Sequence, residues 1–151
     1  MIISEKKNLE RKFFKNLRNK STAIDMRNVE INVKTYVDSI FSKDLKKKHI
    51  GIYWPLENEV DLRSLGDEYL LALPRCEKNK NLSFCLWDKK QLSKDSHGIL
   101  APDSSNKLSY EEISIIFIPC ISVDKNLIRL GYGGGYFDKL REDKNWRAIP
   151  C

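Results

Sequence analysis

The sequence of 151 residues contains only four cysteines, Cys76, Cys85, Cys120 and Cys151, and they stand far apart along the chain. No two of them form a C-x-x-C pair, and neither of the two histidines lies near a cysteine. Structural zinc sites and disulfide-rich folds depend on closely spaced cysteines. The sequence therefore predicts neither kind of site. Cys85 and Cys120 sit in or beside apolar runs, where a free cysteine packs as a small hydrophobic residue.

Long apolar stretches are also missing. No run is long enough to span a bilayer, and the N-terminal stretch MIISEKKNLERKFF is charged where a signal peptide needs an apolar segment. Internal repeats and low-complexity linkers are absent, and a length of 151 residues fits one domain. We therefore expect a cytoplasmic protein that forms one domain over residues 1–151 and has no membrane partner.

Acidic residues are in deficit, because 21 aspartates and glutamates stand against 27 lysines and arginines. The formal net charge is +6 and the pI is near 9.1, which favours an anionic partner. Nucleic acid, a membrane surface and a phosphorylated small molecule all fit on charge alone. Hydrophobic residues make up 41% of the chain, which is enough for a packed globular core.

Two helices are expected at the N-terminus. Residues 4–20 read as a basic amphipathic helix, with Leu9, Phe13 and Leu17 at four-residue spacing. Residues 26–42 place a second set of apolar side chains on one face, namely Val29, Val33, Tyr36, Val37, Ile40 and Phe41. A lysine-rich connector, KDLKKKH, separates this helix from the apolar segments that follow.

Four apolar segments are expected to form a sheet. HIGIYW, YLLALP, LSFCLW and ISIIFIP cover residues 49–54, 69–74, 82–87 and 113–119. Continuous apolar runs of this kind are typical of a sheet that is covered on both faces. The polar segment 88–111 is expected to be a loop. Ligands of open α/β sheets collect at the carboxyl ends of strands, so the candidate site loops are residues 54–61, 74–75 and 119–124.

The stretch IRLGYGGGYFDK places four glycines between an arginine and an aspartate. It matches neither the Walker A pattern, which needs G-K-[ST], nor the dinucleotide fingerprint G-x-G-x-x-G. Bare main chain before a predicted helix, with Arg129 and Lys139 on either side, is typical of an anion site. We interpret the stretch as phosphate-binding rather than as a glycine-rich turn without a ligand. Asp138 can hold Mg²⁺ beside a phosphate, although the residue alone is better explained as a carboxylate near a helix N-terminus.

A second unusual stretch, YWPLENEVD, contains two aromatic residues, a proline and three acidic residues. Trp54 can stack on a flat heterocycle, and Glu59 can accept hydrogen bonds from the N–H groups of such a ring. A core tryptophan and a solvated acidic loop explain the same residues. The stretch by itself favours these structural explanations.

Five stretches in this order, IYWPLENEVDLRSL, LALPRCE, HGILAPDS, IIFIPCISVD and IRLGYGGGYFDKL, resemble the 5-formyltetrahydrofolate cyclo-ligase family, whose members are also called 5,10-methenyltetrahydrofolate synthetases. The resemblance extends over nearly the whole chain, and the glycine loop with its aromatic pair and aspartate is its most specific part. It implies an α/β fold, a single-domain three-layer α/β/α open sheet of Rossmann-like character with two N-terminal helices.

The resemblance also implies an activity. Family members use ATP and Mg²⁺ to convert 5-formyltetrahydrofolate to 5,10-methenyltetrahydrofolate, and they release ADP and phosphate. The formyl oxygen attacks the γ-phosphoryl group, and N10 of the folate then closes the ring and expels phosphate. Such a reaction needs positioning and charge neutralisation rather than a protein nucleophile, which agrees with the lack of a recognisable Ser-His or Cys-His pair.

The family's site residues can be placed on this sequence by position. Its magnesium aspartate falls on Asp138, and its substrate-contacting residues fall on Trp54 and Glu59. Its nucleotide loop falls on Arg129, Leu130, Gly131, Tyr132, Gly133, Gly134, Gly135, Tyr136 and Phe137. The part of this loop that also lies near the folate comprises Tyr132, Gly133, Gly134, Gly135 and Tyr136.

The family's N-terminal K-x-x-x-R element, which meets ATP, is less sharply defined here. Lys7 and Arg11 keep the four-residue spacing that places both on one face of a helix. An alignment on the leucines would put Lys6 and Glu10 in these places instead. We prefer Lys7 and Arg11, because a glutamate would repel the triphosphate.

The chain departs from the family pattern in two further places. The segment between Asp61 and Pro74 is several residues short, which leaves less room for a crossover helix. Family members also continue beyond the position of Cys151, with further sheet structure and a second acidic metal ligand. We therefore expect low turnover and poor stability. We expect a monomer, and an unpaired sheet edge would give a route to dimers or aggregates.

Three functions are compatible with these patterns. The favoured one is an ATP- and Mg²⁺-dependent enzyme whose partner is 5-formyltetrahydrofolate. The main alternative is a truncated, catalytically impaired member of the same family. A basic nucleic-acid-binding protein is remote, because the lysines gather in the connector and the first helix instead of alternating with aromatic residues on one face. We therefore expect no nucleic-acid partner.

Overall fold

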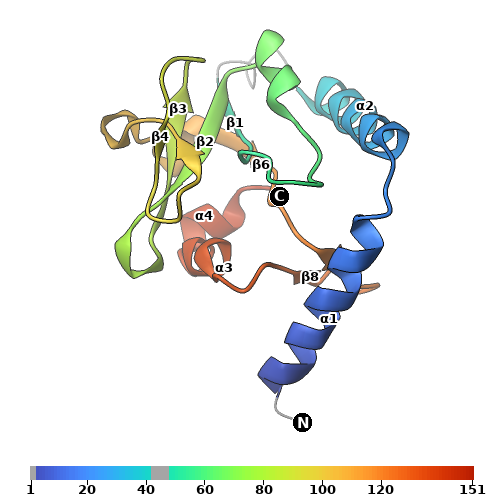
Figure 1. Ribbon diagram of the computed structural model, residues 1–151. Coiled ribbons are helices and arrows are strands. Elements are labelled where there is room, and N and C mark those ends of the chain that lie inside the picture. Colours follow the sequence, from blue (N-terminus) through green and yellow to red (C-terminus); the bar gives the residue numbers. More distant parts are fainter. Residues whose placement is uncertain (1–2, 42–47) are drawn as a thin grey trace.

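The computed structural model describes residues 3–41 and 48–151 (Figure 1). Ser42 and residues 43–47 of the lysine-rich connector lie outside these ranges. The helices are α1 (Ile3–Arg18), α2 (Ala23–Ile40), α3 (Tyr136–Leu140) and α4 (Lys144–Ala148), with 3-10 turns at η2 (Arg63–Asp67), η3 (Lys78–Lys80), η4 (Ser104–Asn106) and η5 (Tyr110–Glu112). The strands are β1 (His49–Gly51), β2 (Leu71–Cys76), β3 (Leu82–Trp87), β4 (Ser93–Lys94), β5 (Leu100–Ala101), β6 (Ile113–Ile116), β7 (Ser122–Val123) and β8 (Arg129–Leu130).

Both predicted N-terminal helices are present. α2 begins three residues earlier than the apolar pattern indicates, because Thr22 and Asp25 form a capping box. The Thr22 hydroxyl accepts the Asp25 backbone N–H at 3.2 Å, and the Asp25 carboxylate accepts the Thr22 backbone N–H at 2.7 Å. The two bonds satisfy backbone donors that a helix start otherwise leaves unpaired.

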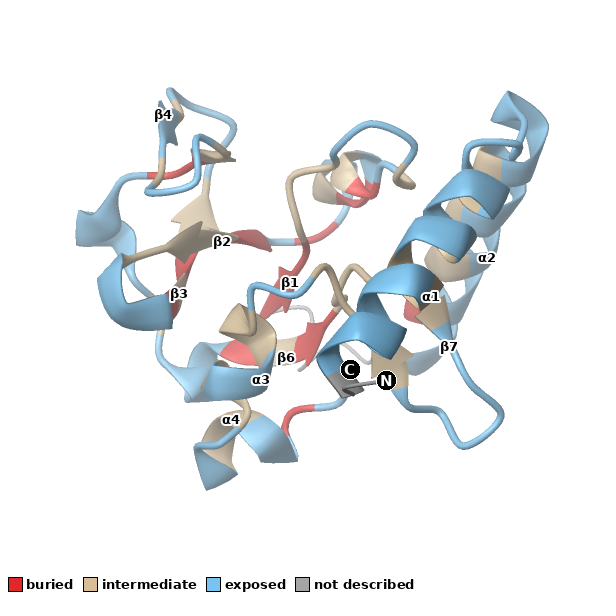
Figure 2. Cartoon of the chain, turned by 60° about the horizontal axis from the view of Figure 1, so that its bottom comes forward, coloured by how far each residue is buried: buried red, intermediate tan, exposed pale blue. Residues whose placement is uncertain are grey.

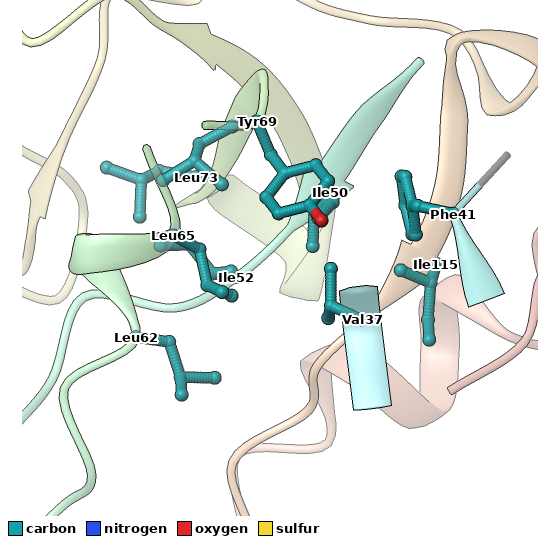
Figure 3. Close-up of a cluster of buried hydrophobic side chains, with 10 residues drawn as sticks. Val37, Phe41, Ile50, Ile52, Leu62, Leu65, Tyr69, Leu73 and Ile115 are labelled. Carbon is teal, nitrogen blue, oxygen red and sulfur yellow. The ribbon is translucent and has the colours of Figure 1, made fainter. Parts of the chain in front are cut away.

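Only one row of the predicted apolar face of α2 enters the core. Val37 and Phe41 are buried, and Val33 packs partly against the same cluster (Figure 3). These three residues follow one another at four-residue spacing, which is one line along a helix. The other members of the predicted face, Val29, Tyr36 and Ile40, are exposed.

α1 is amphipathic, but its apolar row faces outward. Leu9, Phe13 and Leu17 have exposed fractions of 58%, 59% and 45%. The partly buried side of the helix instead carries Glu10, Arg11, Phe14 and Arg18, and it lies beside the β7–β8 segment (Figures 1 and 2). The contact surface of this helix is therefore formed by two arginines, a glutamate and one phenylalanine, and not by the apolar row that the spacing predicts.

The main sheet has the strand order β3-β2-β1-β6. β1 is parallel to both β2 and β6, whereas β3 is antiparallel to β2, so the sheet is mixed. β4 and β5 form a separate hairpin, as do β7 and β8. The expectation of a loop over residues 88–111 is therefore wrong in part. That segment contains the β4–β5 hairpin and two 3-10 turns. Each strand of the hairpin has only two residues, which is too short to give a periodic signal in the sequence.

The predicted strand at residues 69–74 is shifted in the structure, because Pro74 lies inside β2 rather than at its end. β2 pairs with β1 only at Leu71 and Ala72. After Ala72, β2 pairs only with β3 on its other side, where Pro74 is opposite Phe84. Beyond Ala72, β2 is thus an edge strand within the described sheet. A proline is tolerated on an edge because its missing N–H would not have joined the ladder.

Neighbouring residues along β1 and β2 point to opposite faces of the sheet, and each face carries its own apolar cluster. The first cluster joins α2 and η2 to Ile50, Ile52, Leu71, Leu73 and Ile115. The second joins α3 and α4 to Ala72, Leu82, Phe84, Ile113 and Ile116. The three-layer α/β/α prediction is confirmed by this arrangement.

The connection from β1 to β2 is short, as the sequence indicated. It contains the 3-10 turn η2 in place of an α-helix. Leu65 of this turn is buried in the first cluster, so even one short turn covers part of the sheet. No helix in the described ranges is both long enough and apolar enough to cross a membrane.

Candidate active site

A pocket of about 950 Å³ lies where the parallel strands end. Trp54 and Glu59 follow β1, Pro74 lies near the end of β2, and Pro119 follows β6, and all four line the pocket. The carboxyl ends of parallel strands meet at one edge of a sheet, where ligands of open α/β folds bind. The volume is within the usual range for a small-molecule site.

The pocket brings together every residue that the sequence predicts for the site. They come from the N-terminal helix, the loop after β1 and the glycine-rich segment after β7, which are far apart along the chain. They are Lys7, Arg11, Trp54, Glu59, Arg129, Leu130, Gly131, Tyr132, Gly133, Gly134, Gly135, Tyr136, Phe137 and Asp138.

The glycine loop has two kinds of glycine. Gly133 has φ 101° and Gly135, the residue before α3, has φ 74°, and both values favour glycine over any residue with a side chain. Gly131 and Gly134 have no such backbone requirement. A Cβ atom on Gly131 would meet only ordinary contact, 3.6 Å from an Arg129 nitrogen. Neither backbone conformation nor packing therefore requires glycine at position 131. The absence of a side chain there leaves the main chain accessible to a ligand.

α1 is attached to the glycine loop by its cations. Arg11 Nε donates to the Gly131 carbonyl at 2.9 Å. Lys15 Nζ and the Arg18 guanidinium lie 5.3 and 5.5 Å from the centre of the Tyr132 ring, which is within range for a cation–π interaction. Lys7 and Arg11 both line the pocket, together with Glu10, whereas Lys6 of the alternative alignment does not.

Glu59 connects the loop after β1 to the glycine loop. Its Oε2 accepts the Leu56 backbone N–H at 2.8 Å, which closes a turn in which Asn58 has φ 60°. Its Oε1 accepts the Tyr132 hydroxyl. Burial, together with this bond to the carboxylate, raises the pKa of Tyr132 to about 12, so the phenol keeps its proton at neutral pH. An ionised carboxylate has about four lone-pair sites, so Glu59 retains capacity for ligand N–H groups.

Trp54 is half-buried and is held on two sides. The Arg63 guanidinium lies 4.4 Å from the centre of one of its rings, and Trp87 meets it edge-on at 6.2 Å. The Asp61 carboxylate binds Arg63 at 2.5 Å and so orients the guanidinium. Next to Trp54, the Tyr53 hydroxyl donates to the Val60 carbonyl at 2.8 Å, and burial raises the pKa of Tyr53. The indole is therefore fixed in position at the pocket.

Asp138 lies at the pocket with 75% of its side chain exposed, and it forms an ion pair with Arg129. No group of three or more histidine, cysteine or acidic side chains in the described ranges could hold a metal ion by itself. Mg²⁺ is usually bound by one or two carboxylates together with substrate phosphates. A single accessible carboxylate at the end of the glycine loop fits this mode of binding.

The structure adds residues that the sequence reasoning missed. His97 lines the pocket from the β4–β5 hairpin and contacts Tyr136, with its ring nitrogen bonded to the hydroxyl and its ring edge-on at 4.9 Å. Asp95 fixes this hairpin loop by accepting backbone N–H groups from Cys76, His97 and Ile99. The stretch HGILAPDS contains His97, but no local pattern indicates a partner 39 residues away.

The model of the 5-formyltetrahydrofolate cyclo-ligase family matches residues 3–148. The chain belongs to this family. The match covers nearly the whole sequence, including α1, the loop after β1 and the glycine loop. The family prediction made from the five stretches is thereby confirmed.

Individual family members agree with this assignment. A 5-formyltetrahydrofolate cyclo-ligase from Haemophilus influenzae is 24% identical over an alignment of 154 residues, which covers 95% of this chain and 81% of the relative. The structure of a 5,10-methenyltetrahydrofolate synthetase from Aquifex aeolicus matches with a TM-score of 0.72 at 26% identity, over 90% of this chain and 72% of that one. A synthetase from Mycoplasma pneumoniae matches with a TM-score of 0.66 at 20% identity, over 95% and 81% respectively, and shows the same fold.

Proposed function

We propose that this member of the cyclo-ligase family converts 5-formyltetrahydrofolate to 5,10-methenyltetrahydrofolate at the pocket, with consumption of ATP and release of ADP and phosphate. One observation carries the proposal. The glycine loop and the Trp54–Glu59 loop line a single pocket and are joined by the bond from Tyr132 to Glu59. A phosphate site and a site for a flat heterocycle are thus adjacent, as a phosphoryl transfer to a folate requires.

The nucleotide is assigned to the glycine loop and α1. The accessible main chain at Gly131 and Gly134 allows phosphate oxygens to approach backbone N–H groups. Lys7 and Arg11 line the same pocket and supply positive charge. Their role is to hold the polyphosphate and to offset charge as the terminal phosphoryl group is transferred, because positioning and electrostatics dominate this chemistry.

The folate is assigned to the side of the pocket that Trp54 and Glu59 form. The Glu59 carboxylate accepts N–H groups of the ring, and the bond from Tyr132 keeps it in place. Trp54 offers an aromatic surface that Arg63 and Trp87 hold fixed. These contacts would orient the formyl oxygen toward the nucleotide.

Mg²⁺ is assigned to Asp138, together with phosphate oxygens of the nucleotide. When bound, the ion would neutralise charge on the triphosphate. The ion pair between Asp138 and Arg129 must then open or rearrange, because the carboxylate cannot give the same oxygen fully to both cations. Arg129 would remain close enough to act on the same phosphates.

The test is an absorbance assay for methenyltetrahydrofolate formed from 5-formyltetrahydrofolate, ATP and Mg²⁺. We expect turnover that requires all three and stops when EDTA removes the metal. Gly131→Val is expected to lower turnover at least tenfold with an unchanged melting temperature, because its side chain meets only ordinary contacts but obstructs the main chain. Binding of ATP and folate without turnover would instead support the catalytically impaired alternative. Absence of ATP binding by a folded parent chain would contradict the proposal.

A further inference from the structure

The turn between β2 and β3 brings a lysine to the glycine loop from a distant part of the sequence. Lys80 Nζ lies 4.0 Å from the position that a Cβ atom on Gly135 would occupy. Three other lysines, Lys89, Lys90 and Lys107, each pair with a carboxylate. Within the described ranges, no carboxylate pairs with Lys80. Its charge is therefore available beside the loop.

The position of this turn is fixed by contacts with α3. Lys139 Nζ donates to the Asn79 carbonyl at 2.5 Å, which ties the turn to the helix that follows Gly135. The residues on either side of the turn, Cys76 and Leu82, line the pocket. Lys80 thus reaches the glycine loop from a turn that is attached to the same wall of the pocket.

The turn holds its lysine in a backbone conformation that suits glycine better. Asn79 and Lys80 have φ 58° and 59°, and Asn81 N donates to the Lys78 carbonyl at 3.3 Å. A turn with two left-handed central residues is common in hairpins, and glycine is favoured at its second position. Left-handed backbone is not by itself a sign of function, because Lys89 adopts φ 63° and simply pairs with Asp67. Lys80 differs in having the glycine loop as its neighbour.

We propose that Lys80 binds a phosphate of the nucleotide at the Gly135 end of the glycine loop. Arg11 Nε is bonded to the Gly131 carbonyl, and Arg11 Cζ lies 3.4 Å from the position that a Cβ atom on Gly133 would occupy. The two cations therefore meet the loop at different points. The inference rests on the proposed function and adds the β2–β3 turn to the nucleotide site. The family resemblance places Gly135 near both the nucleotide and the folate. We assign Lys80 to phosphate because Arg11, the other cation that meets this loop, is assigned to the polyphosphate.

The deciding variant is Lys80→Gly, because a structural role and a binding role predict opposite results. Glycine relieves the left-handed backbone, so we expect the melting temperature to rise by about 2–4 °C. The lost ammonium is expected to weaken binding of Mg-ATP and of inorganic tripolyphosphate by about five- to tenfold, with folate affinity unchanged. Lys80→Arg keeps the charge and should retain both affinities.

Lys78→Gln is the matched control, since it removes one positive charge from the same turn and is expected to leave both affinities unchanged. An equal loss in Lys78→Gln and Lys80→Gly would mean general charge attraction and would overturn the assignment. Unchanged polyphosphate binding in Lys80→Gly, or a loss confined to folate, would also overturn it.

Binding of tripolyphosphate distinguishes failure of the Lys80 assignment from failure of the proposed cyclo-ligase function. Weakened polyphosphate binding in a chain without cyclo-ligase turnover would uphold Lys80 and refute the function, whereas a parent that binds no polyphosphate refutes both.

Discussion

Glu59 shows how one side chain can serve both the fold and the site. Its carboxylate closes the turn at Leu56 and also accepts the Tyr132 hydroxyl from the glycine loop. The sequence alone favoured a solvated acidic loop for this residue. The structure shows a half-buried group that links two loops at the pocket. The decisive partner, Tyr132, is 73 residues away and could not be inferred from local spacing.

We predict that Glu59→Gln weakens folate binding by about tenfold or more and changes ATP affinity less than threefold. A hydrogen bond to a charged group contributes about 1.5–3 kcal/mol, and the amide replaces one acceptor oxygen with a donor. Tyr132→Phe is the control, because it removes only the hydroxyl and keeps the ring beneath Lys15 and Arg18. Calorimetric titration with each ligand provides the measurement. Equal losses for folate and ATP would show that Glu59 acts only by holding the loops together.

At the scale of a single element, the β4–β5 hairpin is held in shape by one carboxylate, Asp95. The Asp95 carboxylate accepts backbone N–H groups from Cys76 at 3.0 Å, His97 at 2.8 Å and Ile99 at 3.1 Å. Partial burial acts to raise the pKa of Asp95, but these three bonds outweigh it and the pKa is lowered from its ordinary value. One charged side chain thus organises the loop that carries His97 to Tyr136.

Asp95→Asn should lower the free energy of unfolding at neutral pH by about 1–2 kcal/mol, because the amide nitrogen cannot accept the Cys76 N–H. The folded-state pKa lies below the unfolded one, so the charge contributes fully above about pH 4 and its contribution is lost as the pH falls through the lowered pKa. Denaturant titrations across this range should give a shallower acid slope for the variant than for the parent. The control is Asp103→Asn, since Asp103 accepts only the Ser105 N–H at the surface among the described hydrogen bonds. Identical acid slopes for Asp95→Asn and the parent would contradict the account.

Element boundaries were predictable where sequence signals were local. Residues 82–87 form β3 as predicted, because the apolar run is bounded by polar turns. The strand predicted at residues 49–54 ends at Gly51, although Ile52 N still donates to the Ala72 carbonyl, and Tyr53 and Trp54 then line the pocket. Likewise β6 ends at Ile116, before the predicted residue 119. An apolar sequence looks the same whether it pairs in a sheet or lines a cavity, so these ends depend on tertiary contacts.

On the scale of the whole molecule, the sheet separates the two apolar clusters, and Gly51 of β1 faces the second one. A Cβ atom on Gly51 would be 2.9 Å from Phe84 Cε1 and 3.3 Å from Ile116 Cγ1. Both of these side chains are fully buried, and Phe84 stacks on Trp146 of α4 at 5.9 Å. A close-packed interior has little room to absorb such an approach.

Gly51→Ala is therefore expected to lower the free energy of unfolding by about 1–3 kcal/mol through overpacking. Phe84→Leu in the same chain should recover part of the loss, because the smaller side chain removes the clash. A double-mutant cycle measured by denaturant unfolding, followed by circular dichroism and tryptophan fluorescence, gives the coupling. Additive losses in the double variant would mean that the two residues do not meet as described.

The sequence by itself determined the periodic helices, the apolar strands and the motifs that identify the family, because each is written in short-range spacing. Every site residue that was predicted from the sequence lines the pocket in the structure. The tertiary structure alone decided that Arg11 and Arg18 of α1 face the glycine loop, that Tyr132 bonds Glu59, and that His97 and Lys80 reach the same loop. These contacts join segments dozens of residues apart. Their geometry follows from strand order and close packing, which no local pattern encodes.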